Sequence, residues 1–305
     1  MTTYRLGVNT CFAVKRWPDP GSWAPLVADV LGVDLVQHSL DLVDVHAGRA
    51  GLRTQADAVR HACDSHGLGL HSTFTGLAAY SGNLLLHPDP DFRDRAETFL
   101  RLAVEFTAAC GATSTGGHVG AFSVADFADP VRRAALTAEL HERLFELAGY
   151  ARQQGLTGLL VENLAAAREP STMAGIEALL DPGDAWRVPI QLCLDVGHHC
   201  VPGTSGAERD PYEWARRMGH LAPVVQLQQT DGVGDHHWPF TSATNEHGII
   251  RADRLLDALD ASGAGDIALI LEVIPAFEAD DEAVVRDMVE SVGYWREALD
   301  ERGRG

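Results

Sequence analysis

The chain has 305 residues, of which 46% are hydrophobic, so it is long enough to bury one large core. Its formal net charge of −19 argues against nucleic-acid binding, because phosphate contacts need clustered Lys and Arg. The N-terminus lacks the basic start and apolar core of a signal peptide, and no apolar stretch is long enough to span a membrane, so we expect a cytoplasmic protein without a membrane partner.

Eight short apolar segments are predicted to be strands, each followed by a helical pattern. They are residues 4–10, 34–40, 68–74, 112–118, 157–163, 190–195, 224–229 and 267–273. Between them, residues 57–67 and 92–111 carry apolar residues at helical spacing and close with Gly67 and Gly111, a residue type that commonly terminates helices. Strands that alternate with helices predict parallel βαβ units, and eight such units predict a single (β/α)8 TIM barrel domain over residues 1–305.

An open doubly wound sheet is the alternative α/β fold. Such a sheet normally carries a Gly-rich phosphate loop after its first strand. The corresponding segment here, LGVNTCFAVKRW, has no such loop. The barrel is therefore the preferred prediction.

Four of the predicted strands end on a polar residue, namely Glu162, Asp195, Gln228 and Glu272. A buried strand of Val, Leu and Ile has little reason to end on a carboxylate unless that group is paired or binds a cation. We expect the four side chains to hold one divalent metal ion, Mn²⁺ or Mg²⁺ with Co²⁺ also accepted, because the donors are oxygens. For any single residue, a capping or loop-anchoring role is the alternative. Gln226 shares a face with Gln228 and is the second choice for the amide ligand.

Histidines and a tryptophan near other strand ends are candidate contacts to a ligand. His71 is predicted to end the third strand and His118 the fourth, and a hydrogen-bonded structural histidine is the alternative for each. His236, His237 and Trp238 form a compact cluster after the seventh strand. This cluster predicts an aromatic wall over the ligand.

A phosphate on the ligand would have to be met by local basic groups, because the protein as a whole is acidic. Lys15 and Arg16 follow the first predicted strand, and Arg168 follows Glu162. An arginine can bind phosphate through two parallel hydrogen bonds. A solvated loop charge is the alternative for each, and Glu169 would pair with Arg168 when no ligand is bound.

With these residues in view, the chain resembles the xylose isomerase-like superfamily of sugar isomerases and epimerases over essentially its whole length. The segments VENL, LDVGHH, LQQTDG and LEV follow that superfamily's order of Glu, Asp, His or Gln, then Glu. The resemblance implies one metal at the barrel mouth and a His198 that hydrogen-bonds a substrate oxygen, with a weaker claim for His199. Most members place His where this chain has Gln228, whereas hydroxypyruvate isomerase-like relatives are similar in using Gln.

More specifically, FAVKRWP, HSTFTGLAAYSGNLLLHPDP and LEVIPAFEADD are similar to segments of the tetrulose-phosphate 3-epimerases. This resemblance implies a four-carbon ketose phosphate, such as L-erythrulose 1-phosphate, as the substrate. Epimerisation at the hydroxyl carbon beside the ketone needs one proton-transfer group on each face of a planar enediolate, and a divalent ion stabilises its oxygens. Glu162 and Glu272 are predicted to be this catalytic pair.

Other activities remain open on the same metal site. They are aldose–ketose isomerisation, epimerisation of an unphosphorylated ketose, and cleavage of C-glycosides, which would require a larger pocket and a partner chain. A barrel that only binds sugar has no need for two ionisable carboxylates across a cation. An endonuclease would need several His ligands and a basic surface. Barrels of this kind often associate, so the apolar YSGNLLLHP loop is a candidate pocket cover or homo-oligomer contact.

Overall fold

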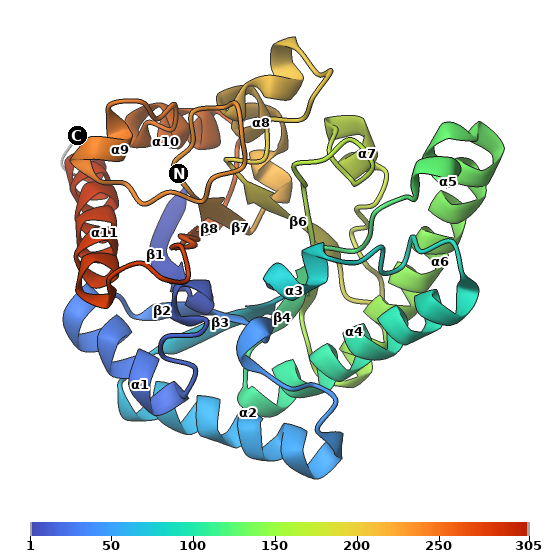
Figure 1. Ribbon diagram of the computed structural model, residues 1–305, viewed down its shortest axis with the longest axis horizontal. Coiled ribbons are helices and arrows are strands. Elements are labelled where there is room, and N and C mark those ends of the chain that lie inside the picture. Colours follow the sequence, from blue (N-terminus) through green and yellow to red (C-terminus); the bar gives the residue numbers. More distant parts are fainter. Residues whose placement is uncertain (1, 304–305) are drawn as a thin grey trace. The chain divides into compact units, whose positions relative to one another are not determined.

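The computed structural model describes residues 2–303. Within them, the strands follow one another in chain order around a closed parallel barrel (Figure 1). The strands are β1 (Thr3–Asn9), β2 (Leu35–Ser39), β3 (Gly69–Phe74), β4 (Ser114–Gly117), β5 (Gly158–Glu162), β6 (Ile190–Asp195), β7 (Val224–Leu227) and β8 (Asp266–Leu271). The predicted TIM barrel and its eight strands are confirmed.

Helices occupy the connections between the strands (Figure 1). They are α1 (Pro20–Pro25), α2 (Gly48–Ser65), α3 (Leu77–Tyr80), α4 (Pro90–Cys110), α5 (Val124–Ala128), α6 (Pro130–Gln153), α7 (Met173–Glu177), α8 (Pro211–Met218), α9 (Ser242–Asn245), α10 (Ala252–Ala261) and α11 (Asp281–Gly303). Helical turns of the 3-10 or π type cover Thr10–Ala13, Leu26–Leu31, Leu40–Leu42, Gly206–Arg209 and Gly219–Leu221. No helix in the described part of the chain is long and apolar enough to cross a membrane.

The sequence explains where several helices begin and end. Asp89, Asp129 and Asp210 each accept hydrogen bonds from the first-turn amides of α4, α6 and α8, and a proline follows each of them. This arrangement is favourable because the first-turn amides need acceptors and proline lacks an N–H at a position where none is required. Gly111 ends α4 at a φ of 90°, a left-handed conformation that glycine adopts without a Cβ clash.

The chain divides into two compact units. One comprises the chain up to Gln37, His61–Gly69 and the chain from Cys193 onward, and the other comprises His38–Arg60 and Leu70–Leu192. In the first unit, β1 pairs with β2 and β8, and β7 pairs with β6 and β8. In the second, β4 pairs with β3 and β5, and α4 lies beside α6 (Figure 1). A single domain over residues 1–305 stays a prediction.

The core of the second unit is built from the strand interiors and one face of α6. Every residue of β5 is buried, as expected for a parallel strand covered on both faces. Leu136, Leu140, Leu144 and Leu147 recur at helical spacing and are buried along α6. Each such leucine contributes about 1.5–3 kcal/mol relative to an exposed side chain.

The polar strand ends lie where the sequence predicts them, within one residue. Glu162 and Asp195 are the last residues of β5 and β6, whereas Gln228 and Glu272 come directly after β7 and β8. This is the C-terminal end of the parallel strands, the edge that carries active sites in TIM barrels.

Candidate active site

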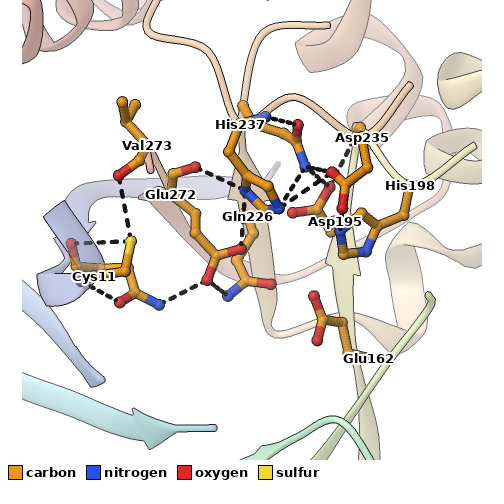
Figure 2. Close-up of polar contacts among 12 residues, drawn as sticks. Cys11, Glu162, Asp195, His198, Gln226, Asp235, His237, Glu272 and Val273 are labelled. Carbon is orange, nitrogen blue, oxygen red and sulfur yellow. Dashed lines mark hydrogen bonds and ion pairs between the residues drawn. The ribbon is translucent and has the colours of Figure 1, made fainter. Parts of the chain in front are cut away.

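The ends of β6, β7 and β8 bring four buried polar side chains into one cluster (Figure 2). Asp195 pairs with Gln226 across β6 and β7, and Leu227 pairs with Leu271 across β7 and β8, so the residues that follow lie side by side. Asp195, Gln226 and Gln228 are fully buried, and Glu272 is 6% exposed. Buried carboxylates are unfavourable without hydrogen bonds or a cation, so their partners determine what the cluster can do.

One carboxylate oxygen of Glu272 accepts two amide hydrogen bonds (Figure 2). Oε1 accepts hydrogen bonds from Nδ2 of Asn9 at 2.8 Å and from Nε2 of Gln226 at 2.7 Å. The same two amide nitrogens also donate to Oε1 of Gln37, each at 2.9 Å. Gln226, the second choice for a metal ligand, therefore anchors Glu272 through its nitrogen.

Gln228 presents its amide nitrogen to the carboxylates of the cluster. Nε2 donates to Oδ1 of Asp195 at 3.0 Å and to Oδ1 of Asp235 at 2.9 Å. Its oxygen accepts the backbone N–H of His237 at 2.7 Å. A nitrogen that carries protons cannot bind a metal, so in this arrangement Gln228 orients Asp195, and metal binding by Gln228 stays a prediction.

Asp235, in the loop between β7 and α9, connects two histidines of the cluster (Figure 2). Its Oδ2 lies 3.3 Å from Nε2 of His198, and its Oδ1 lies 3.1 Å from Nε2 of His237. Burial opposes ionisation of Asp235, but the charges and hydrogen bonds of the two histidines hold its pKa well below the usual range. Burial likewise opposes protonation of His237, but Asp235 raises the pKa of His237 to about 9.

Three side chains of this unit offer ligand atoms to one point. Asp195, His198 and His237 each have one such atom, and these atoms all lie within 4.8 Å of one another. Buried Asp195 and Glu272 add negative charge that a divalent cation would balance, so the donor set fits such an ion. His237 contacts Asp235 through Nε2 and the carbonyl oxygen of Glu272 through Nδ1 at 3.1 Å, so it would have to release one contact to bind a metal.

In the second unit, Glu162 has a partner that the sequence analysis did not identify. The hydroxyl of Tyr80 donates a hydrogen bond to Oε2 of Glu162, which is fully buried. The Tyr80 ring stacks on His118 with 5.0 Å between centroids and 20° between planes. His118 directly follows β4, as predicted, and its Nε2 lies 3.4 Å from the carbonyl oxygen of Gly82.

The predicted place of His71 was wrong. His71 is the third residue of β3, which continues to Phe74, because Ser72, Thr73 and Phe74 pair in register with β4. Its Nδ1 lies 3.0 Å from the hydroxyl of Ser72. His71 therefore lies three residues before the strand end at which a ligand contact was expected.

The two basic residues after β1 differ in their surroundings. Lys15 is exposed, and its Nζ lies 3.9 Å above the ring of Phe277. The side chain of Arg16 is only 3% exposed, donates to backbone carbonyls within Ala276–Ala279 at 2.7–3.1 Å and lies 2.9 Å from Asp281. Arg16 therefore joins the loop after β1 to the loop after β8. The alternative of a solvated loop charge was wrong for Arg16.

Four other candidates occupy distinct environments. Arg168 is exposed in the loop after β5. His199 packs against Trp214 with 4.8 Å between ring centroids, and burial, with the charge of His198, lowers the pKa of His199 to about 3. A buried, neutral His199 is consistent with the weaker prediction that this residue contacts the substrate. His236 and Trp238 stack at 4.0 Å, so they form an aromatic pair as expected, although their contact with a ligand stays a prediction.

The sequence analysis missed Asp235, Tyr80, Asn9 and Gln37. Asp235 stands directly before the HHW cluster, and this proximity was the available signal. Tyr80 lies within the LAAYSGN segment, where nothing in the spacing connects it to Glu162.

With this geometry established, comparison with known proteins identifies the family. A model of the xylose isomerase-like TIM barrel family matches residues 27–297. The chain belongs to this family. The resemblance predicted from the strand-end motifs is thereby confirmed.

Individual members of the xylose isomerase-like family cover nearly the whole chain. The D-erythrulose 1-phosphate 3-epimerase of Brucella abortus (strain 2308) is 27% identical over 299 residues, which are 97% of this chain and 96% of that protein. A crystal structure from Rhodospirillum rubrum ATCC 11170, provisionally assigned as a xylose isomerase, has 36% identity and a TM-score of 0.89 over 96% of this chain and 99% of its own. The D-psicose 3-epimerase of Clostridium cellulolyticum H10, solved with D-tagatose, has 16% identity and a TM-score of 0.68 over 97% and 99%, a likeness of fold alone.

Proposed function

We propose that this protein is a divalent-metal-dependent 3-epimerase of a small ketose, with a tetrulose phosphate such as erythrulose 1-phosphate as its substrate. The observation that carries the proposal is the cluster of buried Asp195, Gln228 and Glu272 at the strand ends. Membership of the family and the 27% identity to a D-erythrulose 1-phosphate 3-epimerase support the substrate class.

The metal ion, Mn²⁺ or Mg²⁺ with Co²⁺ as a further possibility, would be held by carboxylates from consecutive strands. Asp195 and Glu272 belong to the cluster already described, and Glu162 ends β5, the neighbour of β6 in the closed barrel. The C-terminal ends of parallel strands lie on one edge, which supports Glu162 as the third carboxylate. Gln228 would be a fourth ligand through its oxygen. When bound, the ion would supply Lewis-acid stabilisation to the oxygens of the enediolate.

Glu162 and Glu272 would transfer the protons, one on each face of the planar intermediate. Oε1 of Glu272 accepts two amide donors, and Oε2 lies 3.7 Å from Nδ1 of His237, so we propose Oε2 as the oxygen that carries the proton. One carboxylate would remove the proton from the hydroxyl carbon beside the ketone, and the other would deliver a proton to the opposite face. Inversion at that carbon is the result.

Substrate contacts would come from the side chains around the cluster. His198, His118, His237 and Trp238 are candidates for the sugar oxygens and the carbon skeleton. Lys15 and Arg168 are exposed cations on the loops after β1 and β5, and we propose them for the phosphate. Arg16 is excluded from this role because its guanidinium already binds backbone carbonyls and lies beside Asp281.

The proposal is tested by incubating Mn²⁺-loaded protein with erythrulose 1-phosphate in D₂O and following the carbon-bound protons by NMR. Exchange at the hydroxyl carbon next to the ketone is the expected NMR result. The opposite enantiomer, which has the same NMR spectrum as the substrate, should appear on chiral chromatography. Exchange with unphosphorylated ketoses alone would overturn the phosphate assignment. Exchange at the free terminal carbon of an unphosphorylated tetrulose, with formation of an aldose, would instead indicate aldose–ketose isomerisation, the activity suggested by the provisional assignment of the Rhodospirillum rubrum relative.

A further inference from the structure

Tyr80 occupies a defined position beside Glu162. Its hydroxyl donates to Oε2 of that carboxylate, and its ring stacks on His118. All three residues belong to the same compact unit of the chain. A buried carboxylate oxygen with a hydroxyl donor is both stabilised and fixed in orientation, because hydrogen bonds to ionised groups are stronger than neutral ones.

The short helix that carries Tyr80 is anchored independently of Glu162. Both carboxylate oxygens of Asp41 accept backbone N–H groups at the start of α3, from Leu77 at 2.6 Å and from Ala78 at 3.1 Å. Gly76 precedes them, and a Cβ at this position would lie 2.1 Å from Asp41, so the close approach requires glycine. The backbone of the helix that carries Tyr80 therefore has an anchor other than the bond between Tyr80 and Glu162.

Glu272, the other proposed proton-transfer group, has a different kind of support. Its Oε1 accepts two amide N–H groups, from Asn9 and Gln226, whereas Oε2 of Glu162 accepts a phenolic O–H. These donors differ in kind, and loss of the Tyr80 hydroxyl removes one of them from Glu162.

We infer that Tyr80 is a positioning residue that orients Glu162 for proton transfer on one face of the substrate. This inference rests on the proposed epimerase function. Without the hydroxyl, Glu162 would exchange protons with the substrate more slowly, and Glu272 would be unaffected. The two directions of the reaction would then respond differently.

The asymmetry follows from the order of the proton transfers. Starting from the epimer whose proton faces Glu272, removal proceeds normally and delivery by Glu162 is slow, so a solvent deuteron returns to the original face. The recovered starting material then carries deuterium without inversion. Starting from the other epimer, removal by Glu162 is itself slow, so conversion falls without this excess exchange.

The experiment compares Tyr80→Phe with wild type and with Tyr150→Phe. Phenylalanine at position 80 keeps the ring that stacks on His118 and removes only the hydroxyl. Tyr150→Phe removes another hydroxyl–carboxylate bond, the 2.7 Å contact with Glu105 between α6 and α4, and is expected to leave turnover unchanged. Each Mn²⁺-loaded protein is incubated in D₂O with the D and, separately, the L enantiomer of erythrulose 1-phosphate. Recovered substrate and product are then separated by chiral chromatography, and deuterium is measured in each.

For Tyr80→Phe we expect kcat to fall about tenfold, the loss typical of one hydrogen bond to a charged group. For each starting form we take the ratio of deuterium exchange without inversion to conversion into the other form. This ratio should rise by a similar factor when the reaction starts from one of the two forms, and should not rise when it starts from the other. A ratio that is unchanged from both epimers, or raised equally from both, would overturn this inference while the epimerase stands. A wild-type protein that exchanges neither epimer would overturn the proposed function itself, and the inference with it.

Discussion

The carboxylate of Asp235 lies 3.1 Å from Nε2 of His237, whose Nδ1 lies 3.1 Å from the carbonyl oxygen of Glu272. Both ring nitrogens of His237 therefore face acceptors, which favours the doubly protonated imidazolium. The side chain of His237 is only 11% exposed. A buried cation thus connects the loop after β7 to the end of β8.

The Asp235–His237 pair predicts that stability falls on the alkaline side of neutrality. The pKa of His237 is raised from 6.5 to about 9, so the folded state binds this proton more tightly than the unfolded state does. Its contribution is complete below pH 6.5 and is lost as the pH rises through 9, at up to about 1.4 kcal/mol per pH unit. Urea unfolding of metal-free protein at pH 6.5 and pH 9 measures this loss. Asp235→Asn should reduce the pH dependence, whereas Asp34→Asn, at an exposed carboxylate, should leave it as in wild type.

Replacing either proposed proton-transfer group should nearly abolish turnover. A positioned acid or base contributes about 10²–10⁴-fold, so we expect Glu162→Gln and Glu272→Gln each to lower kcat by at least 100-fold. The measurement is the rate at which one enantiomer of erythrulose 1-phosphate is converted into the other, followed by chiral chromatography. Glu282→Gln, at an exposed position of α11, is the control. If the Glu272→Gln variant turned over substrate at the wild-type rate, the proposed role of Glu272 would be contradicted.

Asn9 should affect metal binding although it is not a proposed ligand. It holds Oε1 of Glu272, and loss of such supporting hydrogen bonds typically weakens metal affinity 10–100-fold. We expect the Asn9→Ala variant to bind Mn²⁺ about 10–100-fold more weakly than wild type in a calorimetric titration. Removing the metal from wild-type protein with a chelator should stop epimerisation, and adding Mn²⁺ back should restore it. Unchanged Mn²⁺ affinity in a folded Asn9→Ala protein would argue against Glu272 as a ligand.

The buried face of α6 should dominate the stability of its unit. Leu144→Ala removes a side chain that is 2% exposed, and such truncations cost about 2–5 kcal/mol in the free energy of unfolding. Val131→Ala on the same helix alters a residue that is 80% exposed and should cost less than about 0.5 kcal/mol. Urea denaturation compares the two variants, with the same dependence of unfolding free energy on urea concentration used for both. Equal losses would mean that α6 does not pack as described.

Local patterns in the sequence were sufficient for the fold. Apolar runs such as TGLLVEN predicted buried parallel strands, and Gly111 predicted a helix end, because burial and backbone conformation depend on residues close in the chain. The positions of Glu162 and Asp195 at strand ends followed from the same patterns. His71 shows the limit of this reasoning: the predicted segment 68–74 ends at Phe74 as β3 does, but His71, expected at the strand end, is its third residue.

The contacts of the candidate site were decided by tertiary structure. Strand alternation placed Gln226 and Gln228 on one face, but it could not predict that Gln226 donates to Glu272 and Gln228 to Asp195. Nor could it connect Tyr80 to Glu162, which lies 82 positions away in the chain. A hydrogen bond requires two atoms within about 3 Å and in the correct orientation, and for residues far apart in sequence only the folded chain brings them together.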